Sequence, residues 1–387
     1  MLAPRSRNVL FIGHEGSISG APVLLLNLLL LLQRQGYRFT LVVAVGGPFV
    51  DTYRRHFPVM VMKPSGYGKE KNPFRRFRNI LLNRVRVARL LLRAWKADAV
   101  VSNTIVNGRL LRRLYPFRNK MVCYVHELES MIRYYPGEAA LSMQLCRLFA
   151  YPSGAVRHTL QQGHGIGADR LHRLSYYFPV EEQLLNSSSA RKQFAHDFRQ
   201  RFGLDNDFVV GGMGVICKRK GTDLFLAVCE QVARQQPDIR FCWIGPFESE
   251  GARREIQAQM EERQLQHQIV FTDVLPHHYY NLAAFDLFFL SSREDPYPLV
   301  VLEAGFMEVP AICFAASGGI TEFVDSDAGW IIDDFSVAQT AELILHLYRH
   351  RDDLVKKGAI ARSKSLELHS NPSRILKEFN HLLDQIA

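Results

Sequence analysis

Short apolar runs alternate with helical stretches along the first half of the chain, and this alternation limits the possible fold more than any other feature. The first run, Asn8 to Ile12, is followed by a polar, glycine-containing loop and then by a helix from about Ala21. Further runs of this kind lie at 39–45, 59–62, 98–102 and 121–125. Such runs, separated by helices, are typical of parallel strands joined by helical crossovers. We therefore predict one doubly wound domain up to about residue 178.

The second half repeats the alternation after a break in composition. Asn186 to Ser189 is polar and has no periodicity, which indicates a linker. Beyond it, we expect strands at 208–214, 240–245, 269–272, 287–290 and 310–314. We expect helices at about 221–235, 251–263, 299–307, 336–349 and 371–386. The prediction is an α/β chain of two Rossmann-like doubly wound domains, 1–182 and 183–370, with a C-terminal helix, 371–387, that returns to the first domain.

Two such domains that face each other across a cleft would place the carboxyl ends of both sheets at that cleft. Ligands of doubly wound folds bind at this edge of the sheet. A cleft between domains can also close and exclude water, which matters where water competes with the intended acceptor of a group transfer. We therefore expect the ligand site between the two domains.

Composition favours a cytoplasmic protein. The 387 residues are 47% hydrophobic, enough for two packed cores. His14 and Glu15 end the first apolar run too early for a signal peptide, and Val23 to Leu32 is too short to cross a bilayer. No cysteines form a CxxC pair or a metal-ligand spacing, so we interpret them as reduced, buried thiols. The cysteines are Cys123, Cys146, Cys217, Cys229, Cys242 and Cys313.

The formal charge of +10 is unevenly spread along the chain. Between Lys63 and Lys120 the only acidic residues are Glu70 and Asp98, although arginines are frequent there. Leucines interleave with arginines from Arg75 to Arg93, which is typical of an amphipathic helix at a membrane surface. We expect an anionic lipid surface or an anionic acceptor as partner, not nucleic acid, and peripheral attachment to the inner face of the cell membrane. The alternative is that these arginines only coat a solvated helix.

The segment from Ser291 to Gly305 carries the clearest chemical signal. It follows an apolar run, turns through Pro296 and Pro298, and enters a helix at about Leu299. The amino terminus of such a helix offers free amide groups to a diphosphate. Asp295 lies on the loop and Glu303 lies about two turns into the helix, so that each carboxylate can hold neighbouring hydroxyls of a nucleotide sugar.

This segment resembles the donor-site signature of retaining glycosyltransferases of family four (glycosyl transferases group 1) on the GT-B fold, of the cell-envelope or lipopolysaccharide type. Asp295 and Glu303 have the separation of the two acids in that signature. In the second half the resemblance includes Lys218 to Gly221, Trp243 to Pro246, Gly318 to Glu322 and Gly329. In the first half it is looser and rests on His14 to Pro22 and Val125 to Glu127.

The resemblance implies a role for each matching residue. Glu303 would bind the ribose hydroxyls, and Asp295 would hold hydroxyls of the donor sugar. Lys220 would neutralise the diphosphate, and His126 would lie beneath the sugar near the reacting carbon. His126 and Asp295 are therefore the candidate catalytic residues. The candidate donor-binding residues are Gly16, Ser19, Gly20, Lys218, Arg219, Lys220, Glu294, Leu299, Val300 and Glu303.

We expect transfer without a metal or another cofactor, from a UDP- or GDP-linked sugar. Lys220 and a helix amino terminus can compensate the charge of a departing nucleoside diphosphate. Asp325-Ser326-Asp327 matches the Asp-x-Asp spelling of metal-using transferases, but it is predicted to lie in a surface turn. Asp205-Asn206-Asp207 is interpreted as a turn before a strand.

Three histidine positions have alternative interpretations. His126 follows a strand and is either a structural residue or part of the site. His14, beside Glu15, could contact the acceptor, and His277-His278 are interpreted as base-side or surface residues.

The leading functional hypothesis is a retaining transferase that moves a sugar from a nucleotide sugar to a glycan or lipid-linked acceptor. The alternatives are a nucleotide-sugar epimerase and a non-catalytic nucleotide-sugar-binding subunit of a glycan-assembly complex.

Overall fold

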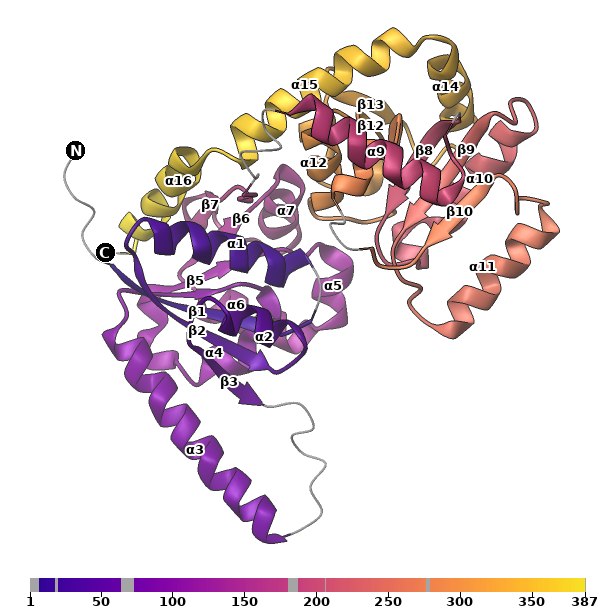
Figure 1. Cartoon of the computed structure of the whole chain (residues 1–387). Helices are drawn as coiled ribbons and strands as arrows, with labels where there is room; N and C mark the ends of the chain where they lie inside the picture. Colours follow the sequence, from indigo (N-terminus) through magenta and orange to yellow (C-terminus); the bar gives the residue numbers. More distant parts are fainter. Residues whose placement is uncertain are drawn as a thin grey trace. The chain divides into compact units, whose positions relative to one another are not determined.

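A computed structural model describes residues 7–17, 20–63, 73–179, 187–205, 207–275 and 279–386, with side chains omitted for residues 73–77. The chain forms two compact units. Unit 1 comprises Met1–Pro179 and Asn371–Ala387, and unit 2 comprises Val180–Ser370 (Figure 1). The predicted division at 182/183 falls within residues 180–186, outside the described part of the chain.

Unit 1 contains a seven-stranded sheet in the order β3-β2-β1-β4-β5-β6-β7, in which all pairs are parallel. Its strands are β1 (Asn8–Glu15), β2 (Arg38–Val45), β3 (Val59–Lys63), β4 (Ala99–Ser102), β5 (Met121–Tyr124), β6 (Leu148–Tyr151) and β7 (Leu171–Arg173). The winding direction reverses at β1, where Val9 pairs with Phe39 of β2 on one side and Ala99 of β4 on the other. The gap between β1 and β4 is therefore the topological switch point of unit 1.

The helices of unit 1 enclose this sheet. They are α1 (Gly20–Arg34), α2 (Phe49–Arg54), α3 (Pro73–Lys96), α4 (Gly108–Arg112), α5 (Glu129–Tyr134), α6 (Pro136–Leu145), α7 (Gly154–His158) and α16 (Pro372–Asp384). The apolar run of α1 is buried as predicted, with Leu25, Leu29 and Leu32 almost fully covered. No helix among the described residues is both long and apolar enough to cross a membrane.

The C-terminal helix α16 packs on unit 1, although α15, immediately before it, belongs to unit 2. The ring of Phe379 stacks on Phe11 of β1 with centroids 6.1 Å apart. The carboxylate of Glu378 accepts from the backbone amide of Ser175 at 2.6 Å. These contacts attach residues almost 370 positions apart in sequence to the same core.

Unit 2 contains a six-stranded parallel sheet in the order β10-β9-β8-β11-β12-β13. Its strands are β8 (Phe208–Met213), β9 (Ile239–Ile244), β10 (Ile269–Thr272), β11 (Leu287–Leu290), β12 (Ala311–Phe314) and β13 (Gly329–Ile332). The order reverses between β8 and β11, so the loops that follow these two strands meet at the switch point.

Seven described helices accompany the second sheet. They are α9 (Ser188–Phe202), α10 (Thr222–Ala233), α11 (Glu250–Glu262), α12 (Leu299–Phe306), α13 (Thr321–Val324), α14 (Val337–Arg349) and α15 (Arg351–His369). Phe225 of α10 contacts Trp243 of β9 edge to face and stacks on Phe289 of β11, with centroids 5.0 and 5.7 Å apart. The predicted fold class is confirmed. The 19-residue helix α15 was not predicted, and neither was α9, which begins at Ser188 within the segment interpreted as a linker.

Gly221, which ends the loop after β8, is required by its backbone and its surroundings. It has a left-handed φ of +68°, and an added Cβ would lie 1.9 Å from the carbonyl oxygen of Ser291. Gly203 has nearly the same φ, +67°, but open space around it. A comparison of substitutions at Gly221 and Gly203 therefore separates the effect of backbone strain from the effect of steric contact.

We expect Gly221→Ala to destabilise unit 2 more than Gly203→Ala does. Both changes carry the left-handed penalty of about 1–2 kcal/mol, and only the first also forces the loops after β8 and β11 apart. Urea unfolding of the two variants checks this expectation. An equal loss of stability in both would contradict the close packing of these loops.

Candidate active site

In unit 2, the predicted donor-binding residues gather at the switch point between β8 and β11. A short 3₁₀ turn, η5 (Lys218–Lys220), follows β8, and Asp295 lies on the loop after β11. A bridge between Asp295 and Gly318 adds the loop after β12 to the same edge. Since parallel strands end at one edge of their sheet, residues far apart in sequence meet here.

Lys220 and Asp295 form an ion pair at the centre of this edge. The Lys220 Nζ atom lies 2.5 Å from Asp295 Oδ2, and the two side chains are only 14% and 10% exposed. The Asp295 amide donates to the Ser317 carbonyl at 2.7 Å, which fixes the backbone beneath the carboxylate. A buried pair of this kind compensates the desolvation of each charge only while both partners stay in place. The cation predicted to face a diphosphate is therefore held in position.

A second ion pair joins the loop after β11 to the start of α10. Arg293 donates both guanidinium ends to Asp223, at 2.7 and 2.6 Å, and one of them also to the Lys218 carbonyl at 2.8 Å. Burial works against the charged form of Asp223, but the hydrogen bonds and charge of Arg293 prevail and lower its pKa. The predicted donor-binding Arg219 donates to the Glu294 carbonyl at 3.0 Å. Lys218 and Arg219 thus take part in loop structure as well as lying exposed beside the site.

Helix α12 begins at Leu299, where the prediction placed it, with Pro298 as its N-cap. The first amides of a helix, here those of Leu299 and Val300, have no carbonyl partner within the helix and point along its axis. Glu303 lies one turn further, where about two turns were predicted, and is only 3% exposed. The helix therefore brings a positive dipole end and a buried carboxylate to the same loop.

The tyrosine of this loop is bound to the end of α15. Tyr297 Oη lies 3.1 Å from His369 Nε2, and both residues are buried, at 4% and 2% exposure. His369 is the last residue of α15 and the penultimate residue of unit 2. The chain therefore leaves unit 2 from a point that contacts the candidate site directly.

In unit 1, the residue with the clearest site geometry is His126, just after β5. Its Nε2 lies 3.1 Å from Asn103 Oδ1, and its Nδ1 lies 3.1 Å from Tyr176 Oη. The Asn103 amide nitrogen donates to the Ala21 carbonyl at 3.0 Å, which leaves its oxygen to accept. His126 therefore carries its proton on Nε2 and accepts from Tyr176 on Nδ1, so that both ring nitrogens are used within unit 1.

Desolvation shifts the pKa values of His126 and of its neighbour Glu127 in opposite directions, in each case against the charged form. Desolvation lowers the pKa of His126 to about 3. It also raises the pKa of Glu127, although hydrogen bonds from the Thr104 hydroxyl and from the His126 and Ile105 amides act in the opposite direction. Glu127 thereby ties the loop after β4 to the end of β5. At neutral pH, His126 presents an uncharged polar ring at the carboxyl edge of the sheet.

The glycine-rich loop after β1 forms the other side of the unit 1 switch point. The Gly16 amide donates to the Val45 carbonyl at 3.0 Å, so this amide is engaged inside unit 1. Gly20 begins α1, and Ser19 lies outside the described residues. His14 Nδ1 lies 3.1 Å from Asn107 Oδ1, which connects this loop to the segment after β4.

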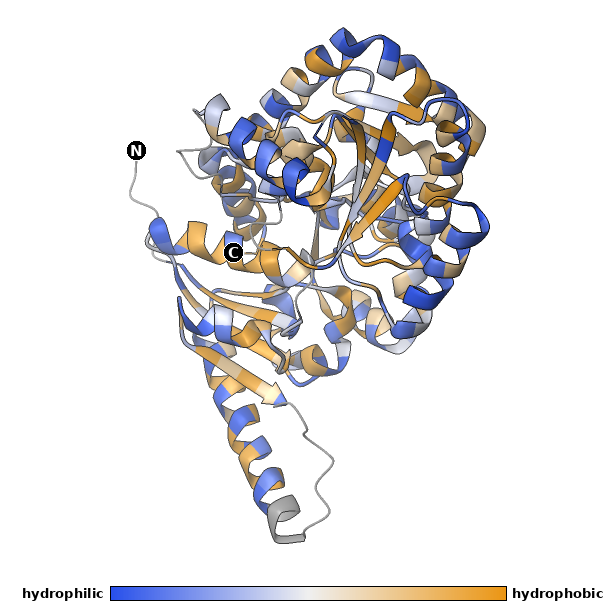
Figure 2. Ribbon diagram, turned by 45° about the vertical axis from the view of Figure 1, so that its right-hand side comes forward, coloured by the Kyte–Doolittle hydropathy of each residue, from blue (hydrophilic) through white to orange (hydrophobic). Residues whose placement is uncertain are grey.

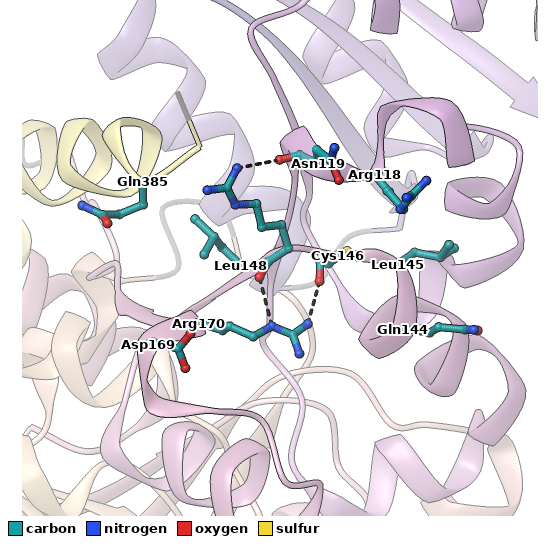
Figure 3. A pocket seen from close by; sticks show the side chains of 10 residues that line it. Arg118, Asn119, Gln144, Leu145, Cys146, Leu148, Asp169, Arg170 and Gln385 are labelled. Carbon is teal, nitrogen blue, oxygen red and sulfur yellow. Dashed lines mark hydrogen bonds between the residues drawn. The ribbon is translucent and has the colours of Figure 1, made fainter.

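The described cavity of about 520 Å³ lies elsewhere, at the opposite edge of the unit 1 sheet. Its lining residues precede β5, β6 and β7 and include Gln385, just after α16. Arg170 donates to the carbonyls of Arg147 and Cys146 at 3.0 and 2.7 Å (Figure 3). None of the predicted site residues lines this cavity. We interpret it as the joint at which α16 meets the amino ends of these strands.

The two Asp-x-Asp segments have structural partners. Asp327 forms an ion pair with Lys364 at 2.6 Å, which lowers its pKa. Asp207 faces Arg240 at 3.5 Å. Over the described part of the chain, no group of three or more histidine, cysteine or acidic side chains is arranged to hold a metal ion. His277 and His278 lie outside the described residues.

Sequence reasoning missed several residues that shape the two switch points. Asn103 and Thr104 directly follow β4, so the rule that selected His126 after β5 would have found them. The partnership of Arg293 with Asp223 had no sequence signal, because the two residues lie 70 positions apart. The contact of Tyr297 with His369 was missed because α15 itself was not predicted.

Comparison with known proteins identifies the family that shares this architecture. "Glycosyl transferases group 1" matches residues 195–364, and "Glycosyltransferase Family 4" matches residues 18–175. Anabaena Alr3699/HepE, solved in complex with UDP and glucose, has a TM-score of 0.80 at 18% identity, and the match covers 97% of this chain and 99% of that one. The chain belongs to the GT-B glycosyltransferases. The predicted resemblance is confirmed.

Curated relatives are similar over part of their length. An α-D-kanosaminyltransferase of Streptomyces kanamyceticus is 22% identical over 50% of this chain and 48% of its own. An α-galactosylglucosyldiacylglycerol synthase of Streptococcus pneumoniae (strain ATCC BAA-255 / R6) is 35% identical over 27% of this chain and 28% of its own. The chain spans less than half the length of the curated relatives it matches.

The two family matches divide the candidate site residues of this GT-B chain. His126 lies in the family 4 region, whereas Lys220, Asp295 and Glu303 lie in the group 1 region. The individual roles of these four residues stay predictions.

We expect His126 to remain neutral down to acidic pH. Its pKa in the folded chain, about 3, lies below the ordinary value of about 6.5. The unfolded chain therefore takes up the proton first, and stability is lost as the pH falls from about 6.5 towards 3. This loss amounts to about 2 kcal/mol at pH 5 relative to pH 7.5.

An NMR titration of the histidine ring protons, with His126→Gln to assign the signal, measures this pKa directly. Urea unfolding of the wild type and of His126→Gln at pH 7.5 and pH 5 measures the difference in pH dependence. A His126 signal that titrates near pH 6.5 would contradict the buried, neutral state.

Proposed function

We propose that this chain transfers a sugar from a nucleotide-sugar donor to a glycan or lipid-linked acceptor, with retention of the anomeric configuration. The observation that carries the proposal is the buried Lys220–Asp295 pair at the switch point of unit 2, next to the amino terminus of α12. A cation and a helix dipole at this place suit a diphosphate, and neighbouring carboxylates suit sugar hydroxyls.

In this proposal, unit 2 binds the donor along the edge from β8 to α12. Glu303, which is only 3% exposed, accepts hydrogen bonds from the ribose hydroxyls. The amides of Leu299 and Val300 donate to the phosphates. Asp295 accepts from hydroxyls of the sugar, while Lys220 shifts part of its contact from Asp295 to the diphosphate.

The chemical step breaks the bond from the anomeric carbon to the diphosphate and forms a bond to the acceptor hydroxyl oxygen, whose proton leaves with the nucleoside diphosphate. Negative charge grows on the leaving oxygen as the glycosidic bond breaks, and Lys220 lies in a site that excludes most of the solvent. Positioned cations and amides stabilise such charge without further reorganisation. We therefore propose that this transfer needs no metal ion or other cofactor.

Unit 1 supplies the acceptor side in this proposal. His126, held by Asn103 and Tyr176, gives the sugar an uncharged polar surface and takes up no second proton at neutral pH. Gly16, Ser19 and Gly20 remain the candidate donor contacts of unit 1. His126 then shapes the position of the reacting carbon without acting as an acid or a base.

The names of the two curated relatives support retention and an envelope acceptor. Both relatives are named for α-configured products, which a retaining enzyme makes from an α-linked donor. The diacylglycerol in the name of the second relative is a lipid acceptor component. We propose a lipid-linked or cell-envelope glycan acceptor for this chain, reached at the inner face of the cell membrane.

A transfer assay tests the function as a whole. The full chain is incubated with UDP- and GDP-sugars and a cell-envelope lipid extract, in excess chelator. We expect nucleotide release that rises with extract, and a product whose anomeric configuration equals that of the donor by NMR. A product of inverted anomeric configuration would refute the retaining mechanism. Activity that returns only with magnesium or manganese would refute metal independence.

Donor binding should depend on Glu303. We expect Glu303→Gln, which keeps the shape of the side chain, to weaken nucleotide-sugar binding by about 1–3 kcal/mol, because a charged acceptor of hydrogen bonds is lost. Calorimetry with the donor selected by the transfer assay measures this change. Glu342→Gln, on the exposed side of α14, is the matched control. Equal donor affinity in wild type and Glu303→Gln would refute the ribose assignment.

A further inference from the structure

Helix α3 carries two apolar stripes, and only one of them is used by unit 1. Val87, Leu90, Leu91 and Ala94 recur at the i, i+3, i+4 and i+7 positions of one helix face. Leu90 and Ala94 are fully buried in the core of unit 1, and Val87 and Leu91 pack against that core. This stripe explains how the carboxyl-terminal half of α3 is attached to its sheet.

The second stripe faces solvent. Leu81, Val85, Ala88, Leu92 and Trp95 follow one another at i, i+4, i+7, i+11 and i+14, a spacing that places them in one row. At 100° per residue, this row lies roughly 130° around the helix from the core-facing stripe. Leu81, Leu92 and Trp95 are 54%, 50% and 67% exposed. A row of large apolar side chains left uncovered on a protruding helix indicates a binding surface.

Basic side chains border the exposed stripe. Arg78, Arg89, Arg93 and Lys96 lie along one margin by their helical positions, and all four are exposed. Arg84 lies along the other margin and is exposed too. The sequence of α3 contains no aspartate or glutamate. Figure 2 shows this mixture of hydrophobic and hydrophilic residues along α3, which extends away from the strands of unit 1 in Figure 1.

The charge pattern discriminates among the partners that an apolar stripe could bind. A second copy of α3 would bring two helices together that carry only positive charge, with no acidic residue to form interhelical ion pairs. Nucleic acid would use the arginines but would leave the leucines and the tryptophan in water. A bilayer with anionic lipids covers the apolar stripe and neutralises its basic borders at once.

We propose that α3 is the membrane-binding element of this protein and lies in the interface of an anionic bilayer. The stripe from Leu81 to Trp95 enters the boundary between head groups and acyl chains, while the bordering arginines contact the lipid phosphates. Trp95, the most exposed residue of the stripe, lies at head-group depth, where its ring is stabilised. The proposal rests on the proposed function in one respect: membrane attachment brings the protein to a lipid-linked acceptor.

Flotation of the full chain with vesicles tests the proposal. We compare phosphatidylcholine vesicles with equimolar phosphatidylcholine and phosphatidylglycerol vesicles, and expect binding at least tenfold stronger to the second at low salt. Raising the salt to half-molar should reduce binding severalfold, because the attraction to the head groups is screened. Equal binding to both vesicle types, or none to either, would overturn the proposal.

Two triple variants separate the apolar and electrostatic contributions. Each should bind anionic vesicles at least tenfold more weakly than the wild type. The apolar set is Leu81→Gln, Leu92→Gln and Trp95→Gln, and the basic set is Arg78→Gln, Arg89→Gln and Arg93→Gln. Because all six side chains are exposed, the fold should be unchanged, and circular dichroism checks this.

Matched controls make equivalent changes on exposed positions elsewhere. The apolar control is Tyr134→Gln, Val355→Gln and Ile360→Gln, and the basic control is Arg112→Gln, Arg254→Gln and Arg349→Gln. Both controls should bind vesicles like the wild type. If the basic control lost as much binding as the α3 set, net charge and not this surface would be responsible.

Trp95 also provides a spectroscopic signature. Its fluorescence should shift to shorter wavelength when anionic vesicles are added, and the shift should be absent from Trp95→Phe, which keeps the stripe apolar. A concentration-dependent dimer that the apolar set abolishes, without vesicle binding, would assign the stripe to a second copy. Salt-sensitive binding to duplex DNA in place of vesicles would assign the helix to nucleic acid.

Donor affinity distinguishes failure of this proposal from failure of the proposed function. If the chain binds vesicles through α3 but binds no nucleotide sugar, the membrane proposal holds and the transferase proposal is refuted. If the chain binds the donor normally but does not bind vesicles, the transferase proposal holds and the membrane proposal is refuted.

Discussion

The parallel arrangement of both sheets is the constraint on which the rest of the molecule depends. Parallel strands need a crossover after every strand, and the crossovers bring all carboxyl ends to one edge. Where the winding reverses, between β1 and β4 and between β8 and β11, two loops diverge and leave backbone and side chains accessible. His126, one strand away from the first reversal, and Lys220 and Asp295, at the second, owe their positions to this rule.

Keeping charges at such an edge requires that they be compensated before a ligand arrives. Lys220 and Asp295 are almost withdrawn from water, which is tolerable because each neutralises the other. Arg293 and Asp223 join the loop after β11 to the first turn of α10 and lie more exposed, so they fix the geometry at a smaller desolvation cost. In the proposed function, the Lys220–Asp295 pair supplies the charge that contacts the ligand. The Arg293–Asp223 pair fixes the surrounding backbone.

The sequence predicted those parts of the fold that depend on local patterns. Runs such as Phe39 to Val45 predicted strands because both faces of a parallel strand are buried and therefore apolar. The helix start at Leu299 was predicted from Pro298, because proline is favoured at the start of a helix. Helix α15 was missed because its apolar residues form no clear stripe, and its contact with Tyr297 depends on tertiary structure. The neutral state of His126 was equally out of reach, since it results from burial and from partners 23 and 50 residues away.

The two units solve different electrostatic problems with the same architecture. In the proposed function, unit 2 must bind a diphosphate, and it presents a cation and a helix amino terminus. Unit 1 presents the uncharged groups of His126, Asn103 and Tyr176 at the carboxyl edge of its own sheet. Part of the positive charge of unit 1 lies on α3, which projects from the sheet and carries no acidic residue. Under the two proposals, charge serves donor binding in unit 2 and membrane attachment in unit 1, while His126, Asn103 and Tyr176 are uncharged.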